Sequence, residues 1–378
     1  MLLMTPGPTN VSSRVMKAMS RSVVNHRGPE FHAIYESIEE NLKYVFQTEN
    51  EVFILSSSGT GGVECAVSNV VSKGDKVLVP VNGDFSYRLE ETVKAFGGQP
   101  VEIPVKWGDT VDLERIREIV DNEKDIKAIA VVYNETSTGA VTRCLEGIGK
   151  LARARGILFI VDAVSAVAGD ELPVDDWNID LCVTCSQKSI AAPPGLAMVS
   201  LSGKVWESVE KTTASRNNYY FDLKKFRDFH QRKETPFTPA VSLFYALDEA
   251  LNMVKDEGLE NRIARHKVCA KAFYDAAEAM CLELLANERI RSNTVIAIKN
   301  PSEISDKAIQ DTMLNDHGIT IAGGMGPLRG STFRIGSMGI VSRREVVATV
   351  DALENTLRSL GMKLEKGLAV RAAEKAFK

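Results

Sequence analysis

The chain has 378 residues, of which 44% are hydrophobic and 25% charged, and its formal net charge at pH 7 is −4. This length favours one large domain plus a smaller one, and the composition is that of an ordinary globular protein. The slightly negative charge excludes the basic surface that binds nucleic acid or anionic membranes. No apolar run approaches the roughly 20 residues that span a bilayer.

The ends of the chain and its cysteines bear on where the protein resides. The start, MLLMTPGPTN, lacks the basic and apolar regions of a signal peptide, and the end, EKAFK, is not a peroxisomal signal. Cys182 and Cys185 form a lone C-x-x-C whose side chains would point to opposite faces of a strand, so we expect no metal site there. We expect a cytoplasmic protein with reduced thiols and no nucleic-acid or membrane partner.

Short apolar runs alternate with helix-like stretches over the first two thirds of the chain. The helix-like stretches include 61–71 and 144–156, the latter ending in Arg-Gly. Seven runs rich in Val and Ile predict strands that are buried on both faces, at 51–55, 76–81, 99–105, 127–133, 157–162, 179–184 and 196–201. The alternation predicts an α/β fold with a mostly parallel seven-stranded sheet and helices on both of its faces.

The pattern changes near residue 240. A long helix near 240–257 is followed by a second one at 259–280, by short strands, and by a last helix at 342–360. The short strands are expected at 294–299, 318–323 and 332–337. We therefore predict a large domain over 15–255, and a smaller α+β domain formed by 1–14 and 256–378.

Side chains that could bind a ligand or take part in catalysis lie where the predicted strands end. In open α/β sheets the ligand lies beyond the carboxyl ends of the strands. Five such ends carry a glycine-rich turn, an aromatic residue, a hydroxyl cluster, a carboxylate and a lysine, in the segments SSSGTGG (56–62), NGDFS (82–86), NETSTG (134–139), DAVSA (162–166) and CSQKS (185–189).

Taken one at a time, these residues have ordinary explanations as well. The turn at 58–62 opens a helix and could cradle a phosphate, but it is not a Walker A loop and an N-capped tight turn explains it equally well. Asp162 could cap a helix or pair with a buried cation. Phe85 alone is more often a core residue, and Arg334 alone is more often a surface cation on an edge strand.

Lys188 narrows the choice among these explanations. Burying an amine at the end of a strand costs free energy unless its nitrogen reaches water or is bonded to another group. Pyridoxal 5′-phosphate needs a cup for its phosphate, a lysine that bonds its aldehyde as a Schiff base, and a carboxylate that keeps its ring nitrogen protonated. The five strand ends supply all three. We therefore predict this cofactor and no metal.

The motifs also resemble a known family. The chain looks like a class V aminotransferase of the fold-type I pyridoxal-phosphate enzymes, similar to the alanine–glyoxylate and serine–pyruvate aminotransferases. The resemblance covers nearly the whole chain. Its most specific part is SQK followed by Pro-Pro-Gly, and the motifs are TPGPT (5–9), SSSGTGGVE (56–64), NGDFSYR (82–88), NETSTG (134–139), VDAVSA (161–166), SQKSIAAPPG (186–195), TPFTPAVS (235–242) and FRIGSMG (333–339).

The resemblance implies roles for the cofactor-binding residues. Lys188 would bond the cofactor and, once displaced, move a proton between the substrate and the cofactor. Asp162 would pair with the ring nitrogen, Phe85 would stack on the ring where relatives have Trp, and Thr136 would lie near the phenolic oxygen. The phosphate would be held by Ser58, Gly59, Thr60 and Gln187.

The resemblance also implies a homodimer that shares its active sites across the interface. Thr235 would reach the phosphate in the neighbouring subunit, although this chain has Arg232 where relatives have a Tyr. Arg334 would form a bidentate contact with the α-carboxylate of the substrate. Gly7 would let the N-terminal segment approach the substrate, and the glycine-rich segment 322–330 would be either a mobile part of the site or a plain surface loop.

The expected activity is amino-group transfer from a small amino acid, alanine or serine, to a small 2-oxo acid, glyoxylate or pyruvate, in a ping-pong reaction through pyridoxamine phosphate. A cysteine desulfurase is disfavoured, because no cysteine follows Cys281 and Phe85 stands where desulfurases have His. One alternative is 2-aminoethylphosphonate–pyruvate aminotransferase, with Arg27 as the phosphonate-binding cation. The other is a non-catalytic subunit of a larger complex.

Overall fold

Seven strands form the central sheet of the larger lobe in the computed structural model, which describes residues 1–211 and 218–378. Within the sheet β10 runs antiparallel to both neighbours and the other pairs are parallel. The strand order is β2 (Glu51–Ser56), β10 (Leu196–Leu201), β9 (Leu181–Cys185), β8 (Leu158–Asp162), β5 (Ile126–Val132), β3 (Lys76–Val81) and β4 (Gln99–Pro104). The prediction of a mostly parallel seven-stranded sheet is confirmed.

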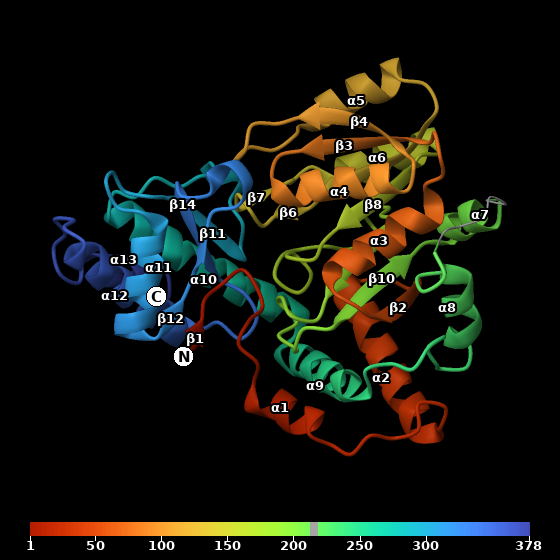
Figure 1. Ribbon diagram of the computed structural model, residues 1–378, viewed down its shortest axis with the longest axis horizontal. Coiled ribbons are helices and arrows are strands. Elements are labelled where there is room, and N and C mark those ends of the chain that lie inside the picture. The colour runs from red at the N-terminus through yellow and green to blue at the C-terminus, as the bar shows by residue number, and fades with distance from the viewer. Residues whose placement is uncertain (212–217) are drawn as a thin grey trace.

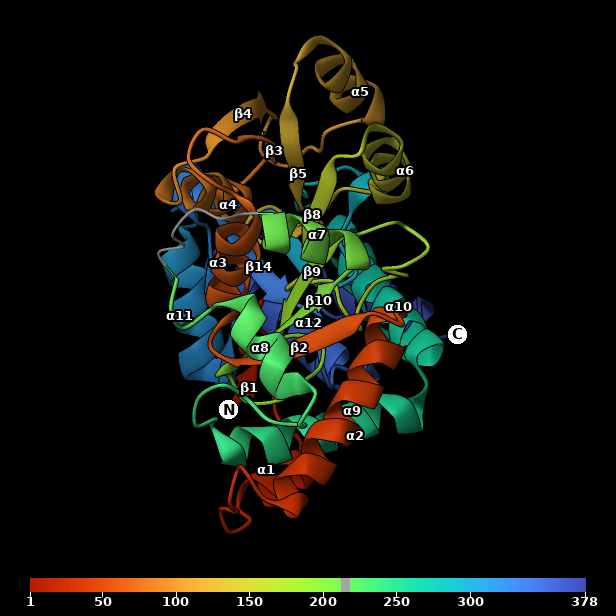
Figure 2. The same cartoon turned by 90° about the vertical axis from the view of Figure 1, so that its right-hand side faces the viewer.

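Helices cover both faces of this sheet (Figures 1 and 2). The helices on one face are α2 (Pro29–Phe46), α5 (Leu113–Asn122), α6 (Leu145–Arg155) and α9 (Val241–Glu257). The helices on the other face are α3 (Gly59–Val70), α4 (Asp84–Ala95), α7 (Gly203–Lys211) and α8 (Leu223–His230). Alternate residues of the inner strands point to the two faces, so the nearly continuous apolar runs are buried on both sides. Cys182 packs in the first layer and its neighbour Val183 in the second.

One expectation about the strands is wrong. The strand β4 lies at the edge of the sheet, and its residues are exposed or half-buried except for Ile103. It carries Glu102 and two prolines, which suit an edge position where no further strand needs its backbone donors.

The smaller lobe combines two short sheets with helices (Figure 1). The first pairs β1 (Leu2–Leu3) with β12 (Ile319–Thr320), so the start of the chain joins its last third. The second has the order β11 (Val295–Lys299), β14 (Thr332–Gly336) and β13 (Ala322–Gly323). The helices are α10 (Leu259–Ala279), α11 (Asp306–His317), α12 (Arg343–Ser359) and α13 (Leu368–Lys375), with short 3-10 turns at Glu288–Ile290 and Gly326–Leu328.

The sequence analysis missed two features of this lobe. The run 318–323 forms two separate short strands, β12 and β13, which belong to different sheets. The helix at 342–360 is not the last one, because α13 follows and packs on α10 and α12. The division into domains at 14/15 and 255/256 stays a prediction.

The carboxyl ends of the parallel strands point toward the smaller lobe (Figure 1). A short hairpin of β6 (Asn134–Glu135) and β7 (Ala140–Val141) follows β5 at this edge, and α1 (Ser13–Met19) packs on α9. Within the described residues, no helix combines the length and apolar composition that crossing a bilayer requires.

Candidate active site

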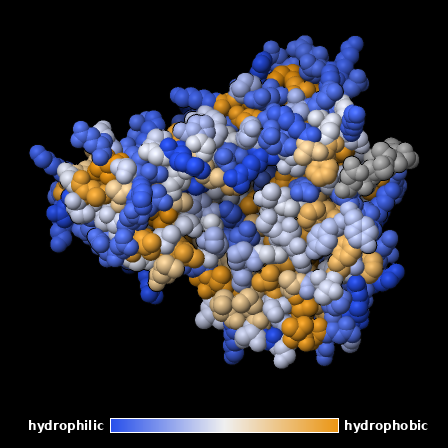
Figure 3. Space-filling view, viewed as in Figure 1, coloured by the Kyte–Doolittle hydropathy of each residue, from blue (hydrophilic) through white to orange (hydrophobic). Residues whose placement is uncertain are grey.

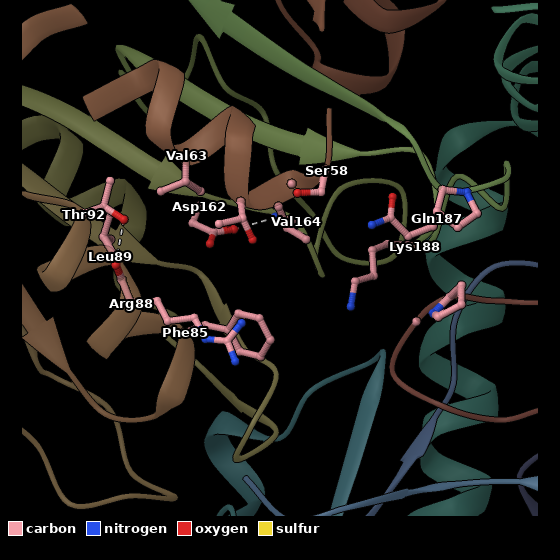
Figure 4. A pocket seen from close by; sticks show the side chains of 15 residues that line it. Ser58, Val63, Phe85, Arg88, Leu89, Thr92, Asp162, Val164, Gln187 and Lys188 are labelled. Atoms are coloured by element: carbon pink, nitrogen blue, oxygen red, sulfur yellow. Dashed lines mark hydrogen bonds between the residues drawn. The ribbon is translucent and has the colours of Figure 1, made fainter. Parts of the chain in front are cut away.

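Eight of the eleven predicted site residues line one cavity of about 220 Å³ at the carboxyl edge of the large sheet. Figure 4 shows Lys188 and Gln187 on one side of the open space, Phe85 and Arg88 on the opposite side, and Asp162 and Ser58 between them. The cavity is lined by Gly7, Pro8, Ser58, Gly59, Thr60, Val63, Phe85, Arg88, Leu89, Thr92, Asp162, Val164, Gln187, Lys188 and Pro194. Residues from strand ends and from the N-terminal segment thus meet in one place.

Lys188 follows β9 and is 9% exposed. Its Nζ donates a hydrogen bond to the backbone carbonyl of Pro6, and burial lowers its pKa from the ordinary value. Gly7 explains how the N-terminal segment comes so close. It has a φ of +106°, and a Cβ there would lie 2.7–2.8 Å from the last three side-chain atoms of Lys188. A buried amine with a lowered pKa is a nucleophile at lower pH than a surface lysine.

Asp162 is the last residue of β8 and is buried. Its Oδ1 accepts a hydrogen bond of 3.0 Å from the amide of Val164, so part of its carboxylate caps the turn that follows. Burial raises its pKa to about 6, against an attraction from Lys188 that lowers it. A cation in the cavity would stabilise the charged form of this carboxylate. Asp162 therefore fits both roles expected from the sequence, as a cap of the following turn and as a partner for a buried cation.

Ser58 is the N-cap of α3, but its hydroxyl makes no hydrogen bond to the first turn of the helix. The hydroxyl is therefore not used as an ordinary cap, and the amides of the first turn lack partners within the helix. Glycines let the helix start lie close to its surroundings, because a Cβ on Gly59 would lie 2.8 Å from Val164, and one on Gly61 would lie 1.9 Å from the Ser57 hydroxyl. The result is a cup suited to an anion.

Phe85 lies in the first turn of α4, where its ring lines the cavity and also packs against the core. The guanidinium carbon of Arg88 lies 4.9 Å from the centre of this ring, and Arg88 pairs with Asp84 at 2.7 Å. Val164 lines the cavity as well. Phe85 and Val164 give the cavity apolar surfaces on which a flat ring could pack.

Thr136 and Arg334 are not among the lining residues, but they are buried and contact each other. The Thr136 hydroxyl is 2.6 Å from the Ser165 hydroxyl, and its carbonyl accepts a hydrogen bond of 3.1 Å from Arg334. Arg334 also donates to the carbonyl of Gly323 at 2.9 Å. It is 6% exposed on the central strand of its sheet, so the interpretation as a surface cation on an edge strand is wrong. Burial lowers its pKa to about 10, against the influence of Glu135.

Three further residues named from the sequence also lie outside the cavity lining. Thr235 is buried and its hydroxyl donates to the carbonyl of Phe237 at 2.7 Å. Arg27 pairs with Glu234 at 2.8 Å and donates to the carbonyl of Thr235 at 2.7 Å, so it holds this segment. Arg232 is exposed and packs over the ring of Phe229 at 5.3 Å.

The segment 322–330 borders the site. Its residue Gly323 accepts the hydrogen bond from Arg334, and Gly326 lies against Trp107 and Asp84, so that a Cβ there would be 2.8 Å from the Trp107 ring. The start of the segment is thus hydrogen-bonded to Arg334, and its middle passes close to Trp107 and to Asp84 at the start of α4. Its mobility stays a prediction.

Sequence reasoning missed Glu135, Arg88 and the carbonyl of Pro6. Glu135 is fully buried, and its carboxylate accepts hydrogen bonds from the first residues of α4. A carboxylate at a strand end, directly before the hydroxyl residues Thr136 and Ser137, was a usable signal. Arg88 stands three residues after Phe85, which places both on one face of a helix. The carbonyl of Pro6 had no sequence signal.

The donor set fits pyridoxal 5′-phosphate. The cavity holds an amine for its aldehyde, a carboxylate for its ring nitrogen, an anion cup with an unused hydroxyl for its phosphate, and apolar surfaces for its ring. Among the described residues, no group of three or more His, Cys, Asp or Glu side chains could hold a metal ion. The fold and the site together define an enzyme of amino-group chemistry that works with this cofactor.

Comparison with known proteins identifies the family. The family described as class-V aminotransferases matches residues 2–341. An uncharacterized aminotransferase of Methanocaldococcus jannaschii is 44% identical, over 98% of this chain and 96% of that protein. The crystal structure of ureidoglycine–glyoxylate aminotransferase from Bacillus subtilis has a TM-score of 0.95 at 33% identity, and covers 99% of this chain and 97% of that one. The chain belongs to the class V aminotransferase family, whose cofactor is pyridoxal 5′-phosphate.

The names of further relatives differ. The small subunit of a soluble hydrogenase from a Synechococcus species is 38% identical, over 100% of this chain and 98% of that protein. Relatives that are 31–33% identical are named as alanine–, serine– or aspartate–glyoxylate aminotransferases. The chain is thus an aminotransferase with relatives that act on several amino acids.

Proposed function

We propose that the protein transfers an amino group from a small amino acid, alanine or serine, to a small 2-oxo acid, glyoxylate or pyruvate. The observation that carries the proposal is the meeting of the Lys188 amine and the Asp162 carboxylate in one cavity next to an anion cup. The names of glyoxylate aminotransferases among the relatives support glyoxylate as the acceptor. The oxo acid formed from the donor leaves before the acceptor binds, which gives ping-pong kinetics.

Bound pyridoxal phosphate supplies an electrophilic aldehyde and an electron-accepting ring. Lys188 would hold the aldehyde through Nζ and would act as the base that carries a proton to and from the substrate Cα. Its lowered pKa leaves the amine neutral, as both tasks require, at lower pH than in an exposed lysine. The carbonyl of Pro6 orients Nζ within the cavity.

The other residues bind and hold the ligand. Asp162 would pair its negative charge with the protonated ring nitrogen, and that proton would offset the cost of burying the carboxylate. Phe85 would pack on the ring, and Thr136 would lie on the side of its phenolic oxygen. The phosphate is held by the start of α3 and its flanking side chains, Ser58, Gly59, Thr60 and Gln187.

Arg334 binds the α-carboxylate of the substrate in this proposal, with Gly7 close to the bound substrate. Two of the guanidinium donors are fixed on the carbonyls of Gly323 and Thr136, which presets the direction of the others. We expect Arg334→Ala to lower kcat/KM for the amino acid by roughly 10- to 100-fold, mainly through weaker binding, since a hydrogen bond to a charged group contributes about 1.5–3 kcal/mol. Steady-state kinetics measure this, with Arg329→Ala as the control because Arg329 is exposed on the neighbouring segment. An unchanged KM in Arg334→Ala would remove Arg334 from substrate binding.

A screen of single substrates tests the proposed function. The enzyme loaded with cofactor is mixed with one amino acid at a time, and the change in the visible absorbance of the cofactor reports amino-group transfer. Each oxo acid is then added to see which one restores the starting spectrum. We expect alanine or serine as donor and glyoxylate or pyruvate as acceptor. No reaction with either donor would contradict the proposal.

The screen also separates the two alternatives. Reaction with 2-aminoethylphosphonate would favour the phosphonate enzyme, although its candidate cation Arg27 is paired with Glu234 and is not among the cavity-lining residues. A protein that takes up no cofactor would favour a non-catalytic subunit of a larger complex, and the Synechococcus relative is itself named as the small subunit of a soluble hydrogenase. The retained amine, carboxylate and cup support catalysis, since a disused site has no need of costly buried polar groups.

We further propose a cytoplasmic homodimer in which Thr235 reaches the phosphate in the partner's site. Figure 3 shows hydrophobic side chains gathered on the lower part of one face, over α1 and α9. Met16 and Val23 are 46% and 70% exposed, and the aromatic residues Tyr219 and Tyr220 are 74% and 41% exposed. Exposed apolar side chains of this size favour burial against a second copy. Sedimentation would then give the mass of two chains.

A further inference from the structure

Glu135 is a fully buried carboxylate that the proposed mechanism does not use. It lies in β6, and both of its oxygens accept hydrogen bonds. Oε2 accepts from the amide and the hydroxyl of Ser86, at 2.8 and 3.0 Å. Oε1 accepts from the amide of Phe85 at 3.3 Å, and from the amide and the hydroxyl of Ser137, at 3.0 and 2.6 Å.

These contacts hold the N-terminus of α4. The N-cap of this helix is Gly83, which has no side chain to satisfy the first amides. Glu135 takes over that task from a different element, and its negative charge suits the positive end of the helix. The Ser137 hydroxyl extends the same network by accepting from the amide of Asp84 at 2.9 Å.

The fit around the carboxylate is tight. A Cβ on Gly83 would lie 2.4 Å from Glu135 Cδ and 2.4 Å from the Ser137 hydroxyl. The start of α4 can therefore approach the carboxylate only because residue 83 is glycine. Such close packing leaves the first turn of the helix little freedom to shift.

The first turn of α4 carries the ring that lines the cavity. Two of the amides that donate to Glu135 belong to Phe85 itself and to the next residue, Ser86, so these contacts fix the backbone from which the ring projects. Arg88 packs over this ring and is paired with Asp84 in the same turn. The position of the ring relative to Lys188 thus depends on a carboxylate that does not line the cavity.

We infer that Glu135 is a positioning residue of the cofactor site. It holds the backbone of Phe85 where the Phe85 ring can stack on the ring of bound pyridoxal phosphate. The inference rests on the proposed function, in which Phe85 packs on the cofactor. It goes beyond it by assigning the buried carboxylate that makes this packing possible. Glu135 acts through Phe85 and does not touch the cofactor.

A double-mutant cycle on cofactor affinity tests this. The dissociation constant of pyridoxal phosphate is measured by absorbance titration of cofactor-free wild type, Glu135→Gln, Phe85→Leu and the double variant. We expect Glu135→Gln to raise the dissociation constant about tenfold, because a displaced Phe85 ring loses its aromatic contact with the cofactor. In the Phe85→Leu background the same substitution should change it less than threefold, because residues that act through one contact are not additive.

Glu90→Gln is the matched control. Glu90 is also a buried glutamate of α4, is 4% exposed, and pairs with Lys94 at 2.6 Å without lining the cavity. It should leave the dissociation constant unchanged. If Glu135→Gln does not fold, Ser137→Ala replaces it and should raise the dissociation constant about threefold, since it removes one link between Glu135 and Asp84.

The outcomes separate this inference from the function on which it rests. Wild type that binds no cofactor would contradict the proposed function. If wild type binds the cofactor and Glu135→Gln leaves the affinity unchanged, or lowers it equally in the wild-type and Phe85→Leu backgrounds, only the positioning role of Glu135 is overturned. Equal losses in both backgrounds would mean that Glu135 only stabilises the fold.

Discussion

Lys188→Ala is expected to lower turnover by roughly 10⁴-fold, because it removes both the nucleophile that holds the cofactor and the base that moves the substrate proton. The visible absorbance that a lysine-bound cofactor gives should disappear together with the activity. The cavity itself should persist, since its remaining lining residues come from separate elements that do not depend on this side chain. Stopped-flow and steady-state assays of the transamination measure the loss.

The control for this variant is Lys204→Ala. Lys204 is another partly buried lysine whose Nζ donates to a backbone carbonyl, that of Ile157, but it lies outside the cavity. It should retain full activity and cofactor absorbance. A Lys188→Ala protein with more than about a hundredth of wild-type turnover would contradict the assignment, because base catalysis alone contributes about 10²-fold or more.

Asp162→Asn is expected to lower turnover by roughly 10²- to 10³-fold and, at the same time, to stabilise the cofactor-free protein at pH 8. Burial raises the pKa of Asp162 from its ordinary value of 3.8 to about 6, so the folded, cofactor-free protein bears the cost of a buried charge above pH 6. Asparagine removes this charge and keeps an oxygen that can accept from the Val164 amide. The free energy of unfolding should rise by about 3 kcal/mol, since each unit of pKa difference corresponds to about 1.4 kcal/mol.

The sign of the pH dependence follows from the two pKa values. Between 3.8 and about 6 the folded state binds the Asp162 proton more tightly than the unfolded state does, so this group makes wild type less stable as the pH rises through that window. The gain in Asp162→Asn should therefore vanish toward pH 4. Urea denaturation at several pH values measures it.

Asp180→Asn provides the contrast for Asp162→Asn. The Asp180 carboxylate is also buried, but it accepts from the Phe159 amide at 2.9 Å and the Ser202 hydroxyl at 2.7 Å, and pairs with Lys204 at 3.3 Å. Removing a charge that has such partners should destabilise the protein at pH 8. Loss of stability in Asp162→Asn as well would contradict the account of Asp162.

The apolar runs in the sequence predicted the strands of the central sheet, because the burial of a short Val- and Ile-rich segment depends mainly on its own residues. Runs such as 76–81 and 196–201 match β3 and β10, because Val- and Ile-rich segments of this length have few ways to bury both faces. The site residues at the strand ends followed from the same pattern, because parallel strands present their carboxyl ends at one edge. This is why the sequence alone predicted that Asp162, Lys188 and Phe85 lie close together, as they do in the cavity lining.

Features set by distant contacts were missed. Whether β4 is an edge strand depends on the strand order, and whether Arg334 is buried depends on β11 and β13 packing on either side of its strand. The contact of Lys188 with the Pro6 carbonyl joins positions 182 residues apart. Glu135 belongs to the same group, since nothing near it in the sequence shows that its partner is the start of a helix some fifty residues earlier.

The bond between Lys188 and the cofactor is the central claim, and chemical trapping tests it most directly. Purified protein is incubated with pyridoxal phosphate, treated with borohydride to make the bond between a lysine nitrogen and the cofactor aldehyde permanent, and digested for peptide mass spectrometry. The account predicts that the cofactor mass appears on the peptide containing Lys188 and is absent from the Lys188→Ala protein. Labelling of other lysines with Lys188 unmodified would contradict it.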